Sequence, residues 1–480
     1  MANINHLINE DPVSTDILKR AGELGEKRGQ DVYVVGGYVR DLFLGRKIKE
    51  VDLMVIGDGV LFAEALSHEL GVKKIVPFPK FSTAKIPYQQ MPVEVSAART
   101  ETYNTGSRKP KEVIYTDLKG DLLRRDFTVN ALAVDCHPDR FGDLNDPHNG
   151  LKDLNKKLLI TPLDPYETFS EDPLRMMRAA YFASALNFEI HPSCIKAIRK
   201  QSNRIVIVSQ ERITVELMKI LGTDKPSIGL EMIQKTGLMK YVFPEIDAMY
   251  GLDQSKEWHH KDIFYHTLQV VDNAAELTEK VELRFAALVH DIAKPNTRRI
   301  DKKKGYTFHG HDAIGERMIH KLSKQLKLSN ELRDYLKKMT LLHLRPIALV
   351  KKEVTDSAVR RVMAAAGDDL DDLMTLCRAD ITTRNPNKVK KYLNNFEIVE
   401  EKMSNVDERD AMRAFQSPVR GKEIMETFDL KEGKKVGRIK HAIEEAILNG
   451  DIKNDIDEAR DFMLKNKDLI FKTEEEKNDK

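Results

Sequence analysis

The stretch of sequence that decides the fold is VVGGYVRDLFLGRKIKEVDLMVIG, residues 34–57. It leaves one apolar run through the pair Gly36-Gly37 and ends in a second apolar run that carries two acids. Paired glycines let backbone amides come close to a phosphate where a helix begins, and Arg40 adds a guanidinium for the same oxygens. A Gly-Gly pair alone is explained more simply by an ordinary strand–helix turn. The phosphate-binding interpretation therefore depends on the two acids that follow.

Those two acids, Glu50 and Asp52, stand two residues apart in a segment that is expected to be a strand. Residues at this spacing point to the same face, so both carboxylates project side by side and repel each other unless a cation lies between them. Mg²⁺ prefers carboxylates together with substrate phosphates, and a pair of metal ions can hold attacking and leaving oxygens. A solvated strand edge is the simpler explanation for an acid pair that stands alone.

Around this stretch, residues 1–150 alternate between short apolar or β-branched runs and helical patterns. Strands are predicted at residues 31–35, 51–56, 72–76, 93–96 and 129–135. The segment LFAEALSHEL is an amphipathic helix between the second and third of them, which indicates a small mixed α/β domain. From residue 162 onward strand signals become rare and helical periodicity dominates. Within that part, Asp172 is expected to cap a helix whose first residue is Pro173.

Composition limits the classes of protein that remain. The chain has 480 residues, of which 41% are hydrophobic and 32% charged, so it has enough apolar material for several cores. No apolar run reaches the ~20 residues that cross a bilayer, and the N-terminus has no signal-peptide pattern. The three distant cysteines form no disulfide framework, which favours the cytoplasm. The net charge of +2 means that any surface for a polyanion must be local.

A Gly-Gly turn, a gap and a carboxylate pair on a strand form an order that resembles the nucleotidyltransferase superfamily, which has the polymerase-β-like fold. GGYVRDLFLGR and KEVDLMVIG are similar to the first motif of one branch, which holds the CCA-adding tRNA nucleotidyltransferases and the poly(A) polymerases. The resemblance implies that four residues of this motif bind the nucleotide: Gly36, Gly37, Arg40 and Asp41.

The same resemblance implies that Glu50 and Asp52 hold Mg²⁺ and, with a third carboxylate, form the catalytic set. The family usually has aspartate at the first position, so Glu50 departs from its pattern, and the longer side chain loosens the metal geometry. Glu94, in the alternating run PVEVSAART, is the candidate for the third carboxylate. An acid on the surface of a strand explains Glu94 equally well.

Two further motifs extend the resemblance. LRRDFTVNALAVD, residues 123–135, is similar to the family's RRDFxxNA motif. Arg124 and Arg125 offer forks for phosphate oxygens, Asp126 orients an arginine or starts a helix, and Asn130 reaches a sugar hydroxyl. A solvated ion-pair cluster is the alternative for Arg-Arg-Asp.

SEDPLRMMRAAYFA is similar to the family's EDxxR motif and contains Asp172, Arg175 and Arg178. An acceptor and a donor fork three residues apart on one helix face can pair with the edge of a base. By the resemblance, this motif selects the incoming CTP or ATP without a template. A capping aspartate with a local ion pair is the structural alternative.

A different pattern follows between residues 259 and 380. Histidines and aspartates recur in helical segments, with VHDIAKP as the strongest piece, and they resemble the ligands of HD-domain metal phosphohydrolases. Imidazole and carboxylate together suit divalent metals. The resemblance assigns one ion of unknown identity to four residues: His266, His290, Asp291 and Asp380. His311 and His343 are candidates for a second metal or for phosphate contacts.

The expected fold class is therefore α+β, with a polymerase-β-like head of a small mixed sheet and helices, followed by an all-α neck, HD domain and tail. The expected domains are 1–160 (nucleotidyltransferase head), 161–255 (neck for base recognition and RNA binding), 256–400 (HD domain) and 401–480 (helical tail that contacts tRNA). In the tail, Val436, Ile439, Ile443 and Ile447 repeat at helical spacing.

The implied activity is the addition of CCA to the 3′ end of tRNA from CTP and ATP, with release of pyrophosphate. The HD domain either hydrolyses phosphates at RNA ends or serves as a helical RNA-binding spacer. The partners are tRNA, CTP and ATP, without a membrane; the oligomeric state stays open. Two alternatives remain: a poly(A) polymerase or a CC- or A-adding enzyme, and an RNA-binding HD phosphohydrolase whose head is impaired by Glu50.

Overall fold

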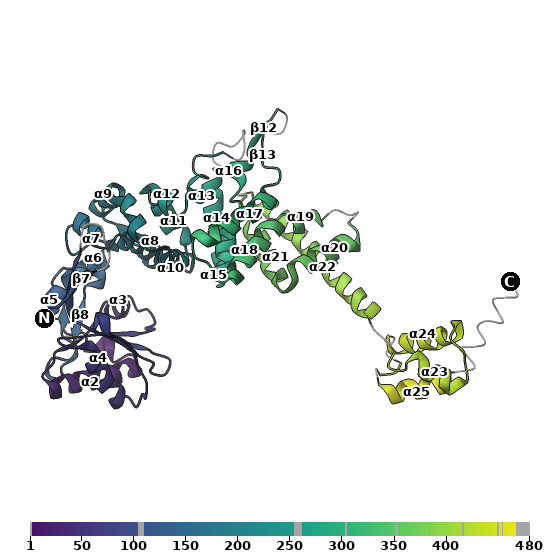
Figure 1. The fold of residues 1–480 in the computed structure, drawn as a ribbon, viewed down its shortest axis with the longest axis horizontal. Helices are drawn as coiled ribbons and strands as arrows, with labels where there is room; N and C mark the ends of the chain where they lie inside the picture. The colour runs from purple at the N-terminus through teal and green to yellow at the C-terminus, as the bar shows by residue number, and fades with distance from the viewer. Residues whose placement is uncertain are drawn as a thin grey trace. The chain divides into compact units, whose positions relative to one another are not determined.

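The computed structural model describes residues 2–103, 110–253, 262–302, 305–350, 354–383, 385–414, 417–448, 451–453 and 455–466. The chain divides into two compact units, one made of residues 1–346 with 366–392 and the other of residues 347–365 with 393–480. Figure 1 colours the ribbon from purple at the N-terminus to yellow at the C-terminus. Among the described helices, none combines the length and apolar composition that crossing a membrane requires.

The first unit begins with a mixed sheet and its helices, the head. The helices are α1 (Asn5–Ile8), α2 (Pro12–Arg28), α3 (Gly37–Phe43), α4 (Gly59–Glu69), α5 (Leu118–Leu123) and α6 (Gly150–Asn155), with 3₁₀ turns η1 (Pro79–Phe81), η2 (Thr128–Asn130) and η3 (Pro138–Arg140). The strands are β1 (Val32–Val35), β2 (Val51–Val55), β3 (Val76–Phe78), β4 (Thr83–Ile86), β5 (Val93–Ala97), β6 (Arg99–Tyr103), β7 (Pro110–Tyr115), β8 (Ala133–Asp135), β9 (Leu144–Asn145) and β10 (Leu158–Leu159).

Helices dominate the remainder of the first unit. They are α7 (Pro165–Glu171), α8 (Leu174–Leu186), α9 (Pro192–Gln201), α10 (Gln210–Leu221), α11 (Pro226–Lys235), α12 (Met239–Val242), α13 (Pro244–Asp247), α14 (Ile263–Leu277), α15 (Val281–Val289), α16 (Lys294–Thr297), α17 (His311–Gln325), α18 (Asn330–Leu342) and α21 (Leu370–Ala379), with η4 (Ser202–Ile207) and η5 (Gly367–Asp369). Short strands are β11 (Glu189–Ile190), paired with β10, and the hairpin of β12 (Arg299–Asp301) and β13 (Gly305–Thr307). The expected α+β class, with a mixed-sheet head followed by helical parts, is confirmed.

The head sheet has seven strands in the order β3-β4-β5-β2-β1-β8-β9. Strands β2 and β5 are parallel neighbours, and their register sets Asp52 beside Glu94. The other pairs in the sheet are antiparallel. The topology therefore brings two predicted acids, far apart in sequence, to adjacent positions.

Helices α2 and α4 cover one face of this sheet and bury its largest core. Asp11 accepts a hydrogen bond from the amide of Val13, and Pro12 opens α2, so local sequence sets its start. Gly29 ends the helix at φ 64°, a left-handed conformation that costs glycine little. Ile17, among the fully buried side chains of α2, packs in the core with the strands. The sheet is thus anchored from one side, which leaves strand ends free for the site.

Two predicted strands differ from the structure. Residues 72–76 were expected to be extended, but the amide of Val72 closes the end of α4 by donating to the carbonyl of Ser67, and β3 begins only at Val76. In the run 129–135 the first residues form the 3₁₀ turn η2, and the strand begins at Ala133. In both places, local hydrogen bonds to preceding residues compete with the hydrogen bonds that would pair the segment as a strand. The β-branched composition of the segments does not reveal this competition.

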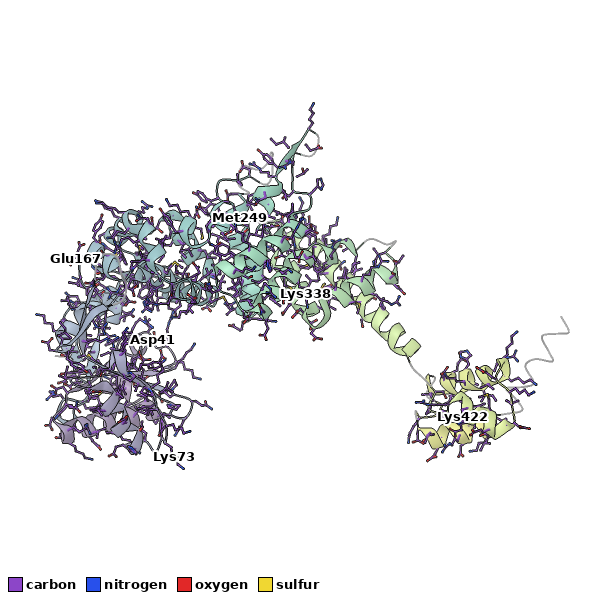
Figure 2. The ribbon with its side chains drawn as sticks, in the orientation of Figure 1. Asp41, Lys73, Glu167, Met249, Lys338 and Lys422 are labelled. Carbon is purple, nitrogen blue, oxygen red and sulfur yellow. The ribbon has the colours of Figure 1, made fainter. Side chains whose placement is uncertain are left out.

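The second unit is helical and includes the greater parts of α20 (Asp356–Ala366) and α22 (Pro386–Ala414), followed by α23 (Gly421–Phe428), α24 (Lys434–Leu448) and α25 (Ile456–Lys465). Helix α19 (Arg345–Ala348) lies where the division between the units falls. The predicted periodicity of α24 is confirmed, because Val436, Ile439 and Ile443 are buried in a small core with α23 and α25. Figure 2 labels Lys422 on this unit and Lys73 on the head.

Candidate active site and metal centre

A cavity of about 820 Å³ lies in the first unit, between the head sheet and helices α8 and α10. Its lining includes most of the predicted head and neck residues: Gly36, Gly37, Arg40, Glu50, Asp52, Arg124, Arg125, Asp126, Asn130, Asp172, Arg175 and Arg178. Asp41, labelled in Figure 2, lines a smaller adjoining cavity of about 370 Å³ that shares Glu50 and Asp52. Four separate motifs therefore open onto one space, and Glu94 lies beside it on β5.

The three predicted carboxylates lie on or next to neighbouring strands. Asp52 is in β2, Glu94 is its partner in β5, and Glu50 lies one residue before β2 begins, in contrast to its expected place within the strand. Burial, with the charges of Glu50 and Glu94, raises the pKa of Asp52 to about 7. Lys85 on β4, which the sequence analysis missed, is 3.0 Å from Glu94 through its Nζ. The three carboxylates offer the oxygen ligands that a divalent cation takes, and Lys85 is a counter-charge for Glu94.

The glycine turn is needed for packing against an arginine. Gly36 has φ 70°, and a Cβ there would lie 2.9 Å from Nη1 of Arg125. Arg40, expected to bind phosphate, already donates to both carboxylate oxygens of Asp41 at 2.9 Å and to Oδ1 of Asn130 at 2.7 Å. The side chains of Arg40, Asp41 and Asn130 thus tie α3 to η2, and their contact with the nucleotide stays a prediction.

A buried aspartate that the sequence analysis missed orients the two adjacent arginines. Asp121 is 1% exposed and pairs with Arg124 at 2.9 Å and with Arg125 at 3.0 Å. These two cations lower the pKa of Asp121 despite its burial, which acts in the other direction. Its spacing of three and four residues from the arginines is a helical ion-pair signal that the sequence contains.

An ion pair between a buried aspartate and a partly exposed arginine joins the head to the neck. Asp126 accepts hydrogen bonds from Arg178 on α8 at 2.7 and 2.6 Å, and its other oxygen accepts from the amide nitrogen of Asn130 at 3.0 Å. Burial disfavours the charged form of both side chains. The charge of the partner, together with hydrogen bonds, has the larger effect in each case, so the pKa of Asp126 is lowered and the pKa of Arg178 is raised. Arg175 adds a second link, because it donates to the backbone carbonyl of Arg124 at 2.6 Å.

The predicted base-reading pair is arranged differently from the expectation. The N-cap of α8 is Pro173, although Oδ1 of Asp172 accepts from the amide of Leu174 at 3.1 Å. The other carboxylate oxygen of Asp172 pairs with Arg212 of α10 at 3.3 Å. Arg175 instead contacts the backbone carbonyl of Arg124 and the carboxylate of Glu171. Arg212 is a cavity residue that the sequence analysis missed, because only the fold brings α10 to this motif.

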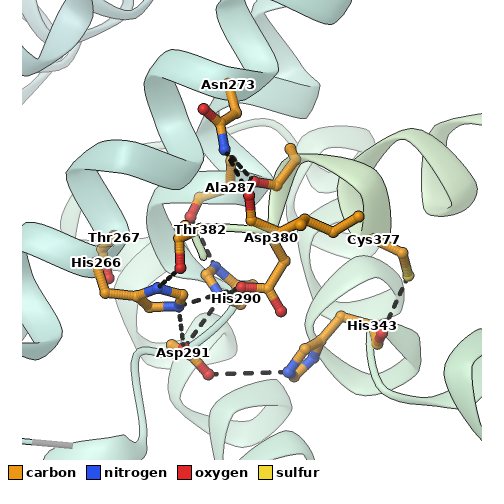
Figure 3. Close-up of polar contacts among 12 residues, drawn as sticks. His266, Thr267, Asn273, Ala287, His290, Asp291, His343, Cys377, Asp380 and Thr382 are labelled. Carbon is orange, nitrogen blue, oxygen red and sulfur yellow. Dashed lines mark hydrogen bonds and ion pairs between the residues drawn. The ribbon is translucent and has the colours of Figure 1, made fainter. Parts of the chain in front are cut away.

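In the second site, four histidines turn the same ring nitrogen toward one centre. Their Nδ1 atoms are held by Thr382, Ala287, Phe308 and Thr340, at 2.7–3.0 Å. The Nε2 atoms of His266, His290, His311 and His343 then lie 3.1–3.8 Å from oxygens of Asp291. Figure 3 shows part of this arrangement, with Asp380 beside His266 and His290. Fixing Nδ1 so that Nε2 is free to ligate is a common feature of metal sites.

The ligand atoms fall into two sets that meet at Asp291. Close donor atoms come from His266, His290 and Asp380 in one set, and from Asp291, His311 and His343 in the other. Nε2 of His290 is buried and lies 3.1 Å from Oδ2 of Asp291, so the nitrogen faces the carboxylate with which it would share an ion. The donor set therefore fits one or two divalent ions, and the predicted ligands are brought together.

The charges of this site balance without an ion. Burial alone lowers the pKa of His290, but Asp291 and Asp380 outweigh it and raise that pKa to about 10. His343, buried beside His290 and His311, has its pKa lowered to about 4. A protonated His290 and Lys294, whose Nζ contacts Asp291, supply the positive charge beside the two carboxylates, and metal binding through His290 must release its proton.

Comparisons with known proteins match three successive parts of the chain. Residues 32–160 match the family described as "Poly A polymerase head domain", residues 187–250 match "Probable RNA and SrmB- binding site of polymerase A", and residues 263–385 match "HD domain". The "Multifunctional CCA protein" of Shewanella frigidimarina is 35% identical over 314 residues, which cover 63% of this chain and 71% of that protein.

Solved structures are similar over most of the chain. A tRNA nucleotidyltransferase complexed with a primer tRNA and an incoming ATP analog is 26% identical, with a TM-score of 0.57, and covers 79% of this chain and 99% of its own. The Thermotoga maritima CCA-adding enzyme complexed with tRNA is 20% identical, with a TM-score of 0.56 and coverage of 96% and 98%, and it shows the shared fold.

The fold and the two sites define a nucleotidyltransferase of the poly(A) polymerase head type that is joined to an HD domain. Within that class, the chain belongs to the family of CCA-adding tRNA nucleotidyltransferases.

The raised pKa of Asp52 predicts that ionisation of this carboxyl group destabilises the folded head. In the folded head Asp52 keeps its proton up to about pH 7, whereas the unfolded chain loses it near pH 4. The carboxylate therefore lowers the free energy of unfolding as pH rises through that window. In EDTA, Asp52→Asn should stabilise the head at pH 8 by roughly 2–4 kcal/mol, and the gain should shrink by about 1.4 kcal/mol per unit from pH 7 to pH 5.

Hydrogen exchange of the β2 and β5 amides, compared between variant and wild type at each pH, measures this gain. Glu64→Gln removes an exposed acid of α4 and serves as the control. Equal protection of Asp52→Asn and wild type at pH 8 would contradict the assigned repulsion.

Breaking the head–neck ion pair should destabilise the first unit. Asp126→Asn leaves Arg178 without its counter-charge, at a cost of about 2 kcal/mol near pH 7. Because the pKa of Asp126 is lowered on folding, the difference from wild type should disappear as pH falls below about 4. Urea unfolding followed by circular dichroism measures both effects, and a pH-independent difference would refute an ionic origin.

Proposed function

We propose that the head and neck add CCA to the 3′ end of tRNA from CTP and ATP, without a template. The main observation behind this proposal is that the acids and the arginines of the motifs line the same cavity. The tRNA 3′-hydroxyl attacks the α-phosphate, a P–O bond to that hydroxyl forms, and the bond to pyrophosphate breaks. A solved relative in complex with a primer tRNA and an ATP analog, and another with CTP, support the choice of substrates.

Glu50, Asp52 and Glu94 are the residues that would hold Mg²⁺. Bound there, the metal supplies Lewis-acid stabilisation of the attacking and leaving oxygens. Asp52 must be ionised to bind it, so the repulsion among the acids favours occupancy of the site. Lys85 keeps Glu94 oriented and neutralises part of the charge.

The arginines of the cavity bind the triphosphate. Asp121 holds Arg124 and Arg125 in place beside Gly36, so their remaining donors point to phosphate oxygens without a cost in side-chain ordering. Asp172 and Arg175 select the base, as the family motif implies, and Arg212 competes with the base for the carboxylate of Asp172. Release of that contact on binding makes the pair available to C or A.

The HD domain is proposed to bind a divalent ion through His266, His290, Asp291 and Asp380 and to hydrolyse phosphoesters at RNA ends. With a 2′,3′-cyclic phosphate, water attacks phosphorus, one ribose P–O bond breaks, and that oxygen takes up a proton. The observation that favours it is the convergence of buried imidazole nitrogens and carboxylate oxygens around Asp291. The Shewanella relative is called multifunctional, which agrees with a second activity.

The four-part division of the chain at residues 160, 255 and 400, with a tail that contacts tRNA, is part of the same proposal. A cytoplasmic location follows from a tRNA substrate.

Nucleotide incorporation tests the transferase. The protein is incubated with tRNA that lacks its 3′ end, Mg²⁺ and labelled CTP or ATP, and two C followed by one A are expected. Asp52→Asn should lower the rate at least about a hundredfold, because metal ions supply several kcal/mol, and Glu64→Gln should not. Long A tails would instead identify a poly(A) polymerase, and no incorporation unless Glu50 is changed to Asp would identify an impaired head.

Hydrolysis of a 2′,3′-cyclic nucleotide tests the HD domain separately. Activity should survive Asp52→Asn and be lost in Asp291→Asn, which removes the carboxylate whose two oxygens face histidines of both ligand sets. Asp334→Asn, at an exposed ion pair with Arg333, is the control. Metal content after dialysis against Ni²⁺, Co²⁺ or Mn²⁺ should fall with the same variant; unchanged content would refute the assigned ligands.

A further inference from the structure

The β12–β13 hairpin lies in the segment of chain that connects two candidate ligands of the HD centre, Asp291 and His311. Strands β12 and β13 follow α16, which comes directly after Asp291, and they end just before His311. Figure 1 shows the hairpin extending beyond the neighbouring helices of the first unit. The carbonyl of Phe308, one residue after β13, accepts the Nδ1 hydrogen bond that orients His311. The hairpin is therefore attached to the metal site at both of its ends.

One face of the hairpin carries an aromatic ring, a guanidinium and an exposed aliphatic side chain. Ile300 lies opposite Tyr306 in the antiparallel register, so the two share a face. Arg298 stacks on the ring of Tyr306, with its Cζ 3.9 Å from the ring centroid. Ile300 is 68% exposed. Nothing among the described residues covers this apolar side chain.

The same face continues into the metal site. Phe308 lies two residues beyond Tyr306, and Nζ of Lys294 is 5.6 Å from its ring centroid. Lys294 in turn contacts Asp291 at 2.5 Å. Two stacked pairs therefore follow one another along the chain, Arg298 on Tyr306 and Lys294 on Phe308, and the second of them contacts Asp291.

We propose that this face, defined by Arg298, Ile300, Tyr306 and Phe308, binds the single-stranded 3′ end of an RNA and presents its terminal phosphate to the HD centre. Rings and a stacked guanidinium accept bases regardless of sequence, and cations along the same line meet the backbone phosphates. Nε of Arg298 is buried without a hydrogen-bond partner among the described residues and is a donor for such a phosphate. Lys302, exposed at the turn, extends the positive charge outward.

This inference rests on the proposed HD hydrolase, and it adds a substrate class to that site. It predicts that the domain prefers an oligoribonucleotide over a mononucleotide with the same reactive end, since only the longer substrate reaches the hairpin.

The experiment compares kcat/KM for cytidine 2′,3′-cyclic phosphate with kcat/KM for a six-nucleotide RNA that ends in the same group. Arg298→Ala should lower the value for the RNA about tenfold, through KM, and leave the mononucleotide unchanged. Arg299→Ala is the matched control, because it removes the same charge from the neighbouring position on the opposite face. Its effect should stay within about twofold. Equal losses in both variants, or none, would overturn the proposal.

A second measurement does not depend on hydrolysis. RNA with 4-thiouridine three nucleotides from a 3′-phosphate is irradiated with the full-length protein, and adducts are mapped by mass spectrometry. An adduct within residues 298–308 supports the docking face even if the wild type hydrolyses neither substrate, an outcome that would remove only the hydrolase proposal. Adducts confined to the head and neck would overturn the docking face itself.

Discussion

The ion pair between Asp126 and Arg178 is the constraint on which the first site depends. It lies where the loop after α5 meets α8, and it holds the triphosphate motif of the head against the base-selection motif of the neck. Asp126 alone would be a buried, unpaired carboxylate, and the partly exposed Arg178 would lose its closest counter-charge, so the two motifs stabilise each other when they are in contact. The bond of Arg175 to the carbonyl of Arg124 adds an uncharged link. The cavity is thus a consequence of this junction and not of the head alone.

The second site depends in a similar way on Asp291. Both of its oxygens face imidazole nitrogens, and each histidine is oriented by a hydrogen bond from its other ring nitrogen or to it. The two sites solve the same problem with opposite means. In the head, burial and the repulsion among three acids raise the pKa of Asp52, whereas in the HD centre a protonated His290 and Lys294 offset the charge of the acids. A divalent ion relieves the first arrangement and displaces a proton from the second.

Much of the fold could be predicted because the decisive signals are local. The Gly-Gly turn, the acid at position 52 and the helical repeat of α24 each depend on residues within a short window. Contacts between distant segments could not be read in this way. Arg212 meets Asp172 only because α10 packs on α8, and Lys85 meets Glu94 only through the register of β4 and β5. The contact between Arg40 and Asn130 was missed for the same reason, because the sequence does not show whether an arginine side chain is already paired.

The central claim is that the junction of Asp126 and Arg178 makes head and neck one catalytic site. A double-mutant cycle on kcat/KM for CTP addition, with Asp126→Asn, Arg178→Gln and the double variant, tests it most directly. The account predicts a coupling free energy of about 2 kcal/mol, so that the double variant is little worse than either single one. Losses that add within about 0.5 kcal/mol would contradict it, because independent residues behave in that way.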